Sequence, residues 1–492
     1  MGIIIKQTVK GSLWSYLGVI IGFVTTTYFY TEYLTPEIVG LFGLLVAIST
    51  ITGGLSSLGL PGVTARLFPR FRSKADGHHG FLLMATLPQI AGFGLFLLLY
   101  FIFREQLIQN NLGKSELFAD YVWLLIPLTL FTLIFVFLDT YNKVLYDAVL
   151  GTFLQEFLQR FLIFVVVALY MFKWINLEQL IIGYAIAVSV KAVVIFVFLL
   201  FRGEITFRSE PGFIDPSLKK EIFDVALFSI IGGLGSLVVF NIDKIVINQM
   251  LDLGNTGVYS IAFYFGTLVV IPSRPLLKIA GTLIADGWSN NDMAKIKEIY
   301  YRSCINQFII GGFLFLGIWA NIDNILAILG PDYQQSKWVI FFIGLGYLFD
   351  MMTGANGLVI GYSKYYRVSL WFILILVVTV VGLLYLFIPL WGITGAALAI
   401  ALALLMNNLM RHLFLVVKYG LQPFTLKFVM VAVVFMAIYL VQYPIPQLYF
   451  LIDILVRGTL IVAGTGLMLV FLPVSDDFQA IWKKGLSLLK RK

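Results

Sequence analysis

The stretch FNIDKIVINQM, residues 240–250, places an aspartate next to a lysine inside a long apolar run. The chain around it has 492 residues, of which 60% are hydrophobic and only 12% are charged. Soluble domains carry about 25% charged residues. Half that density, spread over many apolar runs, is typical of a protein that crosses the membrane many times. The question is therefore how a membrane-spanning helix accommodates Asp243 and Lys244.

Fourteen segments have the roughly 20 mostly apolar residues that a transmembrane helix needs. They lie at 12–31, 38–60, 80–103, 118–139, 149–172, 177–201, 222–249, 257–281, 303–328, 334–361, 366–388, 392–417, 424–442 and 447–472. The sequence thus predicts an all-α polytopic membrane protein with about 14 transmembrane helices. The single cysteine, Cys304, and three histidines without zinc-site spacing predict no disulfide framework, no metal site and no cofactor.

Lysine and arginine alternate strongly between the predicted loops. One set of alternate loops, with the adjoining helix ends, holds 26 of these residues, whereas the other holds four: Arg104, Lys114, Lys173 and Lys337. Positive charge accumulates on the cytoplasmic side of membrane proteins, so both termini are expected in the cytoplasm and the helix number is expected to be even. Orientation and contact with anionic lipid then explain the net charge of +8, and no nucleic-acid partner is expected.

Two similar segments suggest an internal repeat. A shift of 217 residues aligns YLTPEIVGLFGL (33–44) with MLDLGNTGVYSI (250–261), and places Gly40 opposite Gly257. Each segment follows a long helix and enters a helix rich in Gly, Ser and Thr. We expect two pseudo-symmetric six-helix lobes, as transporters often have, although chance similarity of polar loops is the alternative. The predicted parts are residues 1–210, 211–420, helices thirteen and fourteen in 421–474, and a cytoplasmic amphipathic tail, 475–492.

Four cations remain inside the predicted spans: Arg160, Lys191, Lys244 and Arg457. A charge at the bilayer centre costs about 2.5–3.5 kcal/mol on insertion scales, so such residues face the protein interior or water. Helical spacing lets Arg160 pair with Glu156, and Arg457 with Asp453. Each of these pairs could be purely structural. Lys191 has no carboxylate within reach in its own helix, which favours an anion brought from outside.

The opening stretch carries a short polar stripe. Successive residues of a helix point about 100° apart, so Asp243 and Lys244 are not expected to pair with each other. Lys244 instead shares a face with Asn241 and Asn248, at spacings of three and four. That face could line an aqueous cavity, or Lys244 could reach the outer membrane interface; both interpretations stay open.

Asp350 is the most deeply placed carboxylate of the later spans. It lies in line with Tyr347, Gly354 and Gly361. Glycines with this spacing often mark close helix packing, and the alternative is a gating or ion-coupling role for Asp350.

An excess of internal cations suits an anionic substrate, and phosphate is the usual partner of Arg and Lys. Outward movement of two negative charges gains about 4–5 kcal/mol at 100 mV. The candidate substrate-binding residues are Arg160, Lys191, Lys244, Arg457, Asn241 and Asn248, and the candidate gating or coupling residues are Glu156, Asp243, Asp350 and Asp453. The electrostatics therefore favour export of a lipid-linked diphosphate.

Four stretches resemble the polysaccharide flippase family, the Wzx type, of the MATE/MurJ/Wzx (MOP) transporter superfamily. They are YLTPEIVGLFGL (33–44), FNIDKIVINQMLDLGNTGVYSIAFYFGTLVVIPSRPLLKIAG (240–281), GANGLVIGYSKYYR (354–367) and IPLWGITGAALAIALALLMNN (388–408). The resemblance implies two lobes that alternate between inward- and outward-open states around a cationic cavity. It implies that helices thirteen and fourteen accommodate lipid, with Arg457 on the lipid or diphosphate side.

The resemblance also implies a substrate and a place in the cell. The substrate would be an undecaprenyl-diphosphate-linked oligosaccharide, as in O-antigen (lipopolysaccharide) or capsule export across the bacterial inner membrane. Membrane lipid, a polysaccharide polymerase and chain-assembly proteins would be its partners.

Three alternatives differ in testable ways. A MATE-type drug/cation antiporter usually has an acidic residue inside the first helix, whereas this chain has none there before Glu32. A lipid II flippase would use the same chemistry and is not separated by the sequence. A membrane enzyme would need a large outer loop or clustered carboxylates, but the longest outer loop, 104–117, is short. A transporter without catalytic residues is therefore expected.

Overall fold

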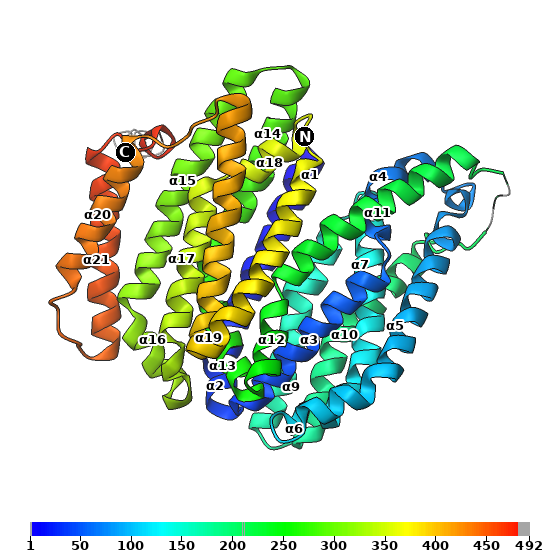
Figure 1. The fold of residues 1–492 in the computed structure, drawn as a ribbon, viewed down its shortest axis with the longest axis horizontal. Coiled ribbons are helices and arrows are strands. Elements are labelled where there is room, and N and C mark those ends of the chain that lie inside the picture. The colour runs from blue at the N-terminus through cyan, green and yellow to red at the C-terminus, as the bar shows by residue number, and fades with distance from the viewer. Residues whose placement is uncertain (1, 209, 211, 481–492) are drawn as a thin grey trace. The chain divides into compact units, whose positions relative to one another are not determined.

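The computed structural model describes residues 2–208, 210 and 212–480, and these form helices joined by short connections (Figure 1). The described part of the chain contains no β-strand. The predicted all-α class is therefore confirmed. The chain divides into two compact units, Met1–Ser260 (unit 1) and Ile261–Lys492 (unit 2). In the predicted amphipathic tail, 475–492, residues 481–492 lie outside the described residues.

Unit 1 contains the first seven predicted spans. Its helical elements are α1 (Gly2–Val24), the π-helical turn η1 (Thr25–Phe29), α2 (Tyr30–Tyr33), α3 (Pro36–Ser56), α4 (Leu60–Phe71), η2 (Gly77–Gly80), α5 (Phe81–Asn111), α6 (Glu116–Tyr121), η3 (Val122–Leu124), α7 (Leu125–Val144), α8 (Val149–Thr152), the π-helical turn η4 (Phe153–Leu158), α9 (Gln159–Met171), α10 (Leu177–Phe201), α11 (Pro216–Val239) and α12 (Ile242–Met250). The next helix, α13 (Leu253–Thr267), begins in unit 1 and ends in unit 2.

Unit 2 contains most of the eighth predicted span and all of the six that follow. Its elements after α13 are η5 (Leu268–Val270), α14 (Ser273–Ser289), α15 (Met293–Ala320), α16 (Ile322–Leu329), η6 (Pro331–Ser336), α17 (Lys337–Thr353), α18 (Asn356–Tyr362), α19 (Val368–Tyr419), α20 (Leu426–Gln442) and α21 (Phe450–Phe471). In Figure 1, α20 and α21 form an antiparallel pair beside α15, and both helices contact α15.

The helices approach the predicted number of about 14 once two breaks and one short helix are taken into account. Among the described residues, eleven helices are long and apolar enough to cross a membrane, and a pair bent by 49°, Pro331–Thr353 with Asn356–Tyr362, adds a twelfth. Helix α19 has 52 residues and is interrupted at Trp391 and Gly392, where Gly392 has φ +55° and ψ −136°. Because about 20 residues span a bilayer, α19 represents two predicted spans, and the 17-residue α20 represents one more. Each of the fourteen predicted spans thus corresponds to helical residues.

The two compact units divide the chain 50 residues later than the predicted lobe boundary at 210/211. Helices α11 and α12 account for the difference, because α11 contacts α3 and α4, and α12 contacts α3. The predicted lobes, 1–210 and 211–420, and the separate segment 421–474 stay predictions.

The two segments that the sequence aligned as a repeat contact each other. A Cβ atom placed on Gly40 in α3 would lie 2.0 Å from the backbone oxygen of Leu253, and one on Gly257 in α13 would lie 1.9 Å from the backbone oxygen of Pro36. Pro36 and Leu253 differ by the same 217 residues as Gly40 and Gly257. The contact is therefore reciprocal: each segment uses its glycine to admit the matching carbonyl of the other. Only residues without a side chain allow helix backbones to approach this closely.

A buried glutamate ties the end of α10 to the α4–α5 connection. Glu204, which is 7% exposed, accepts hydrogen bonds from Lys74 Nζ at 2.9 Å and bonds to His78 Nε2 at 3.0 Å. The hydroxyl of Tyr141 donates to the backbone oxygen of Glu204 at 3.0 Å. Burial acts to raise the pKa of Glu204, but the hydrogen bonds and positive charge of His78 and Lys74 outweigh it, and the net pKa is lowered.

Acid is expected to weaken this link. Folding lowers the pKa of Glu204. Its contribution to stability is therefore fully present above the ordinary glutamate pKa of about 4.3, and it is lost as the pH falls through the lower pKa of the folded state. We expect Glu204→Gln to cost about 1–3 kcal/mol of stability at pH 7 and to remove part of the acid sensitivity. Thermal unfolding between pH 3 and 7 measures both effects. Glu221→Gln is the control, because Glu221 forms an exposed pair with Arg70. An identical pH profile for wild type and Glu204→Gln would contradict this account.

Candidate functional site

Four elements of unit 1, α7, η4, α9 and α10, bring charged and polar side chains together. We call this group the unit 1 cluster. Helix α7 contributes an Asp–Lys pair, η4 and α9 contribute a Glu–Gln–Arg set, and α10 contributes one lysine. The members are Asp139, Lys143, Glu156, Gln159, Arg160 and Lys191. Three cations therefore share the cluster with two carboxylates.

Arg160 is paired as the sequence predicted. Its Nη2 lies 2.8 Å from Glu156 Oε2, and the two side chains are 29% and 22% exposed. The other terminal nitrogen, Nη1, is buried and makes no hydrogen bond to the protein. An unsatisfied guanidinium N–H is costly in a membrane protein. Arg160 thus keeps an unused donor after its ion pair is formed.

Lys191 lies beside this pair. Its Nζ donates to Gln159 Oε1 at 2.9 Å and lies 4.7 Å from the centre of the Phe135 ring. The carboxylates of Asp139 and Glu156 act on it electrostatically. Asp139 itself lies 2.5 Å from Lys143. Lys191 is therefore held by a neutral amide and a ring, and it shares both nearby carboxylates with other cations.

The π-helical turn η4 positions the cluster. Its last residues precede Gln159 directly, and it packs so closely on α1 that a Cβ on Gly18 would lie 1.8 Å from the backbone oxygen of Glu156. Asp139 is similarly close to α8, since a Cβ on Gly151 would lie 1.7 Å from Asp139 Oδ1. π-Helical turns are rare and often occur at functional sites. Two small residues thus allow the charged side chains of neighbouring helices to meet.

The opening stretch forms a different arrangement. Asp243 is fully buried and accepts a hydrogen bond from the hydroxyl of Tyr259 at 2.8 Å. Asn248 is 6% exposed and bonds to Ser115 at 2.8 Å and Asn111 at 2.9 Å. Asn241 donates to the backbone oxygen of Leu237 at 2.8 Å. Asp243 and Asn248 therefore join α12 to α13 and to the α5–α6 connection.

Lys244 lies next to α3. A Cβ on Gly43 would lie 3.7 Å from the Cδ atom of Lys244. Its backbone N–H donates to the side chain of Asp243 at 2.9 Å. The predicted substrate-binding roles of Asn241, Lys244 and Asn248 stay predictions.

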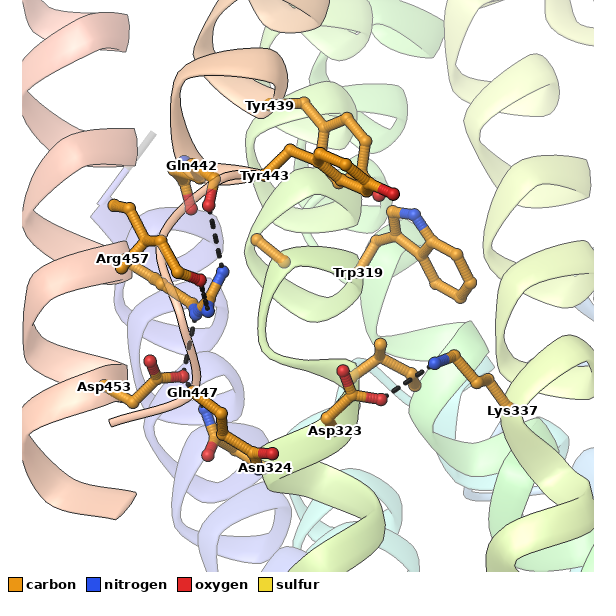
Figure 2. A pocket seen from close by; sticks show the side chains of 13 residues that line it. Trp319, Asp323, Asn324, Lys337, Tyr439, Gln442, Tyr443, Gln447, Asp453 and Arg457 are labelled. Carbon is orange, nitrogen blue, oxygen red and sulfur yellow. Dashed lines mark hydrogen bonds and ion pairs between the residues drawn. The ribbon is translucent and has the colours of Figure 1, made fainter. Parts of the chain in front are cut away.

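In unit 2, the predicted pair Asp453–Arg457 forms and lines a cavity of about 260 Å³ (Figure 2). Arg457 Nε lies 2.7 Å from Asp453 Oδ2, and the side chains are 14% and 2% exposed. Asn324 also donates to Asp453, at 2.6 Å, and Arg457 Nη2 donates to the backbone oxygen of Ile445 at 3.1 Å. This ion pair is therefore embedded in further hydrogen bonds between α16, α21 and the α20–α21 connection.

Asp350 belongs to a buried polar network. Asn408 in α19 donates to Asp350 Oδ1 at 2.9 Å and accepts hydrogen bonds from Thr353 at 3.0 Å and Asn356 at 2.9 Å. Arg411, one helical turn after Asn408, acts on Asp350 electrostatically. This network links α17, α18 and α19, and it leaves the predicted gating or coupling role of Asp350 as a prediction.

The two glycines predicted to mark close packing near Asp350 differ. A Cβ on Gly354 would lie 2.7 Å from Ser303 Oγ, so this position is in close contact, whereas one on Gly361 would have no neighbour within 4 Å. Close packing is therefore confirmed for Gly354, and the expectation was wrong for Gly361.

Sequence reasoning did not assign roles to several residues of these clusters. Lys143 and Asp139 were not among the predicted candidate residues, yet both join the unit 1 cluster. Asn408 and Arg411 lie in the run ALALLMNNLMRHL, where adjacent asparagines inside an apolar span were the available signal. Asn324 had no signal, because its partner Asp453 lies 129 residues away.

A family model described as "Polysaccharide biosynthesis protein" matches residues 6–284, more than half of the chain. The chain belongs to this polysaccharide biosynthesis protein family. The matched range includes every member of the unit 1 cluster and the opening stretch. Membership of the predicted family is thus confirmed at this level, and the Wzx subtype stays a prediction. No curated protein matches the chain in sequence.

Solved structures show which fold this member of the polysaccharide biosynthesis protein family has. The lipid II flippase MurJ, in an inward closed conformation, superposes with a TM-score of 0.67 at 15% identity, over 94% of this chain and 98% of MurJ. A multidrug resistance MATE transporter of the MOP superfamily matches in its inward-facing conformation with a TM-score of 0.60 at 15% identity, over 81% and 97% of the two chains. An outward-facing MATE structure gives 0.54 at 14% identity, over 83% and 94%. The predicted fold is therefore confirmed as that of the MurJ and MATE transporters.

Proposed function

We propose that this protein is a flippase that moves an undecaprenyl-diphosphate-linked oligosaccharide from the cytoplasmic to the outer leaflet by alternating access. The family description and the transporter fold support a membrane transporter in polysaccharide biosynthesis. The finer assignment to O-antigen or capsule glycans rests on the sequence motifs. Polysaccharide polymerase and chain-assembly proteins are the proposed partners.

The unit 1 cluster is the observation that carries this proposal. Its three cations exceed its two carboxylates, and Arg160 retains a buried N–H without a hydrogen-bond acceptor. An anionic group placed beside Arg160 and Lys191 would supply that acceptor and balance the charge. Phosphate oxygens suit this role because guanidinium and ammonium groups bind them through charge-assisted hydrogen bonds. Lys244 and Arg457 are proposed to contact the diphosphate at later stages of transport.

Two related activities compete with this assignment. A lipid II flippase would carry the same diphosphate and lipid, so the cluster would serve it equally well. A drug/cation antiporter would move a positive substrate, which the net positive charge of the unit 1 cluster opposes. The glycan attached to the diphosphate therefore decides between polysaccharide and lipid II transport.

Export in cells that depend on this protein tests the proposal. We expect Arg160→Ala and Lys191→Ala each to lower surface glycan at least about tenfold, since loss of one charge-assisted hydrogen bond is worth about 1.5–3 kcal/mol. Lys173→Ala is the matched control, because Lys173 lies in the short α9–α10 connection outside the cluster. Membrane levels of each variant are compared by immunoblot. Normal export by both cluster variants would refute the cation assignment, and rescue of cells lacking a lipid II flippase would favour peptidoglycan transport.

We also propose that the protein lies in the bacterial inner membrane with both termini in the cytoplasm. Single cysteines test this orientation, because Cys304 is buried. Glu37 and Ala75 are both exposed; Glu37 lies in the first turn of α3, and Ala75 lies in the connection between α4 and η2. An impermeant thiol reagent added to intact cells should label Glu37→Cys and should reach Ala75→Cys only after permeabilisation. The opposite labelling pattern would invert the topology.

A further inference from the structure

The cavity beside Asp453 and Arg457 has a lining that an ion pair alone does not require. It lies between the end of α15, α16, the start of α17, the end of α20 and α21 (Figure 2). Its volume of about 260 Å³ is slightly below that of drug-sized ligand sites, which measure about 300–1,000 Å³. All of its lining residues belong to unit 2.

The charges of this cavity are balanced. Asp453 pairs with Arg457, and at the more exposed side Lys337 lies 2.8 Å from Asp323. Each carboxylate thus already has a cation, so the cavity favours neither a phosphate nor a free cation. An uncharged polar ligand fits this charge distribution better than an ionic one.

Gln442 provides an independent indication of a ligand. This residue is 1% exposed and lines the cavity, yet neither its Oε1 nor its Nε2 makes a hydrogen bond to the protein. A buried amide without hydrogen-bond partners is unfavourable. A ligand hydroxyl both donates and accepts, so neighbouring hydroxyl groups would satisfy both atoms of the amide.

Aromatic side chains complete the opposite wall. Figure 2 shows Trp319, Tyr439 and Tyr443 facing across the cavity from Arg457 and Gln442. Aromatic rings offer a flat apolar surface, and tyrosine adds a polar tip. Together the two walls suit a ring with one apolar face and a hydroxyl-bearing edge. A lipid tail would not suit them, because it would leave the polar groups unpaired.

We propose that this cavity binds one uncharged sugar ring, with its hydroxyl edge at Gln442 and its apolar face against Trp319, Tyr439 and Tyr443. The proposal rests on the proposed function in one respect, since the sugar would belong to the exported glycan. The positive-inside topology assigns the connections that form this cavity to the outer face. The site would then hold part of the glycan as the lipid-linked oligosaccharide reaches the outer leaflet.

Saturation-transfer NMR on the full chain in lipid nanodiscs tests the proposal. The probes are free glucose, galactose, N-acetylglucosamine and rhamnose, with glycerol and inorganic phosphate as comparison ligands. We expect at least one sugar to receive saturation, whereas phosphate and glycerol do not. Absence of transfer to every sugar, or equal transfer to glycerol, would overturn the proposal.

Matched variants test whether the sugar binds in this cavity. We expect Gln442→Leu and Tyr443→Ala to weaken sugar binding about tenfold, equivalent to 1.4 kcal/mol. Gln307→Leu changes another glutamine that is 1% exposed, and Tyr449→Ala changes a tyrosine that is 74% exposed, close to the 75% of Tyr443; neither lines the cavity, and both should bind normally. If Gln442→Leu does not fold, Tyr443→Ala against Tyr449→Ala decides. Equal binding by Tyr443→Ala and wild type would overturn the placement.

The binding assay requires no transport, so its result is separate from that of the export assay. Normal glycan export by Arg160 and Lys191 variants would refute the proposed cation site without affecting sugar binding. Loss of export in those variants together with no sugar binding would refute this inference alone.

Discussion

Replacing Gly40 with alanine is expected to destabilise the protein by about 3 kcal/mol, the upper end of the usual cost of overpacking. The added methyl group would lie 2.0 Å from the backbone oxygen of Leu253, so α3 and α13 would have to separate. Alanine is normally the better helix residue by about 0.5–1 kcal/mol. The expected effect therefore has the opposite sign to the intrinsic helix preference. Thermal unfolding of the detergent-solubilised protein measures it.

The reciprocal geometry makes the prediction sharper. Gly257→Ala should cost about as much as Gly40→Ala, because its methyl group would lie 1.9 Å from the backbone oxygen of Pro36. The double variant should cost less than the sum, since the first methyl group already separates the helices. Gly94→Ala is the control, as a Cβ there has no neighbour within 4 Å. A neutral Gly40→Ala variant would mean that this close approach does not exist in the membrane.

The sequence predicted the fold because the rules that govern it are local. Apolar length defines a span, and the distribution of lysine and arginine fixes an alternation, so neither needs knowledge of distant contacts. The internal repeat rests on few identities and stays a prediction. Alignment placed Gly40 and Gly257 at equivalent positions, and in the structure these two residues lie in contact. The break at Gly392 within α19 follows from the same logic, because one 52-residue helix would greatly exceed the bilayer.

In the candidate sites, only the contacts between side chains of the same helix were predictable from the sequence. The pairs Glu156–Arg160 and Asp453–Arg457 form because a spacing of four places the two side chains on one face. The partner of Lys191 could not be deduced, because Gln159 lies 32 residues earlier on another helix. Helix packing decides such contacts, and packing depends on small residues whose importance a single sequence does not reveal.

Removal of the Asp453 carboxylate is the second large effect. We expect Asp453→Ala to cost about 3–5 kcal/mol, because it leaves the cation of Arg457, which is only 14% exposed, without its counter-charge. Asn324 would also lose its acceptor, which lies 2.6 Å away at Asp453 Oδ2. Thermal unfolding and the yield of folded protein in membranes measure the loss.

The double variant Asp453→Ala/Arg457→Ala distinguishes the loss of the ion-pair attraction from the cost of leaving the Arg457 guanidinium unpaired. It should be more stable than Asp453→Ala alone, since removing both members of a buried pair costs less than removing one. Asp323→Ala is the matched control in the same cavity: its pair with Lys337 is 63% and 37% exposed, and such pairs contribute about 0–1 kcal/mol. Equal losses for Asp323→Ala and Asp453→Ala would show that water reaches Arg457 freely. Arg457 could then release its carboxylate at little cost, which would suit a cation that exchanges partners during transport rather than one that holds α21 to α16.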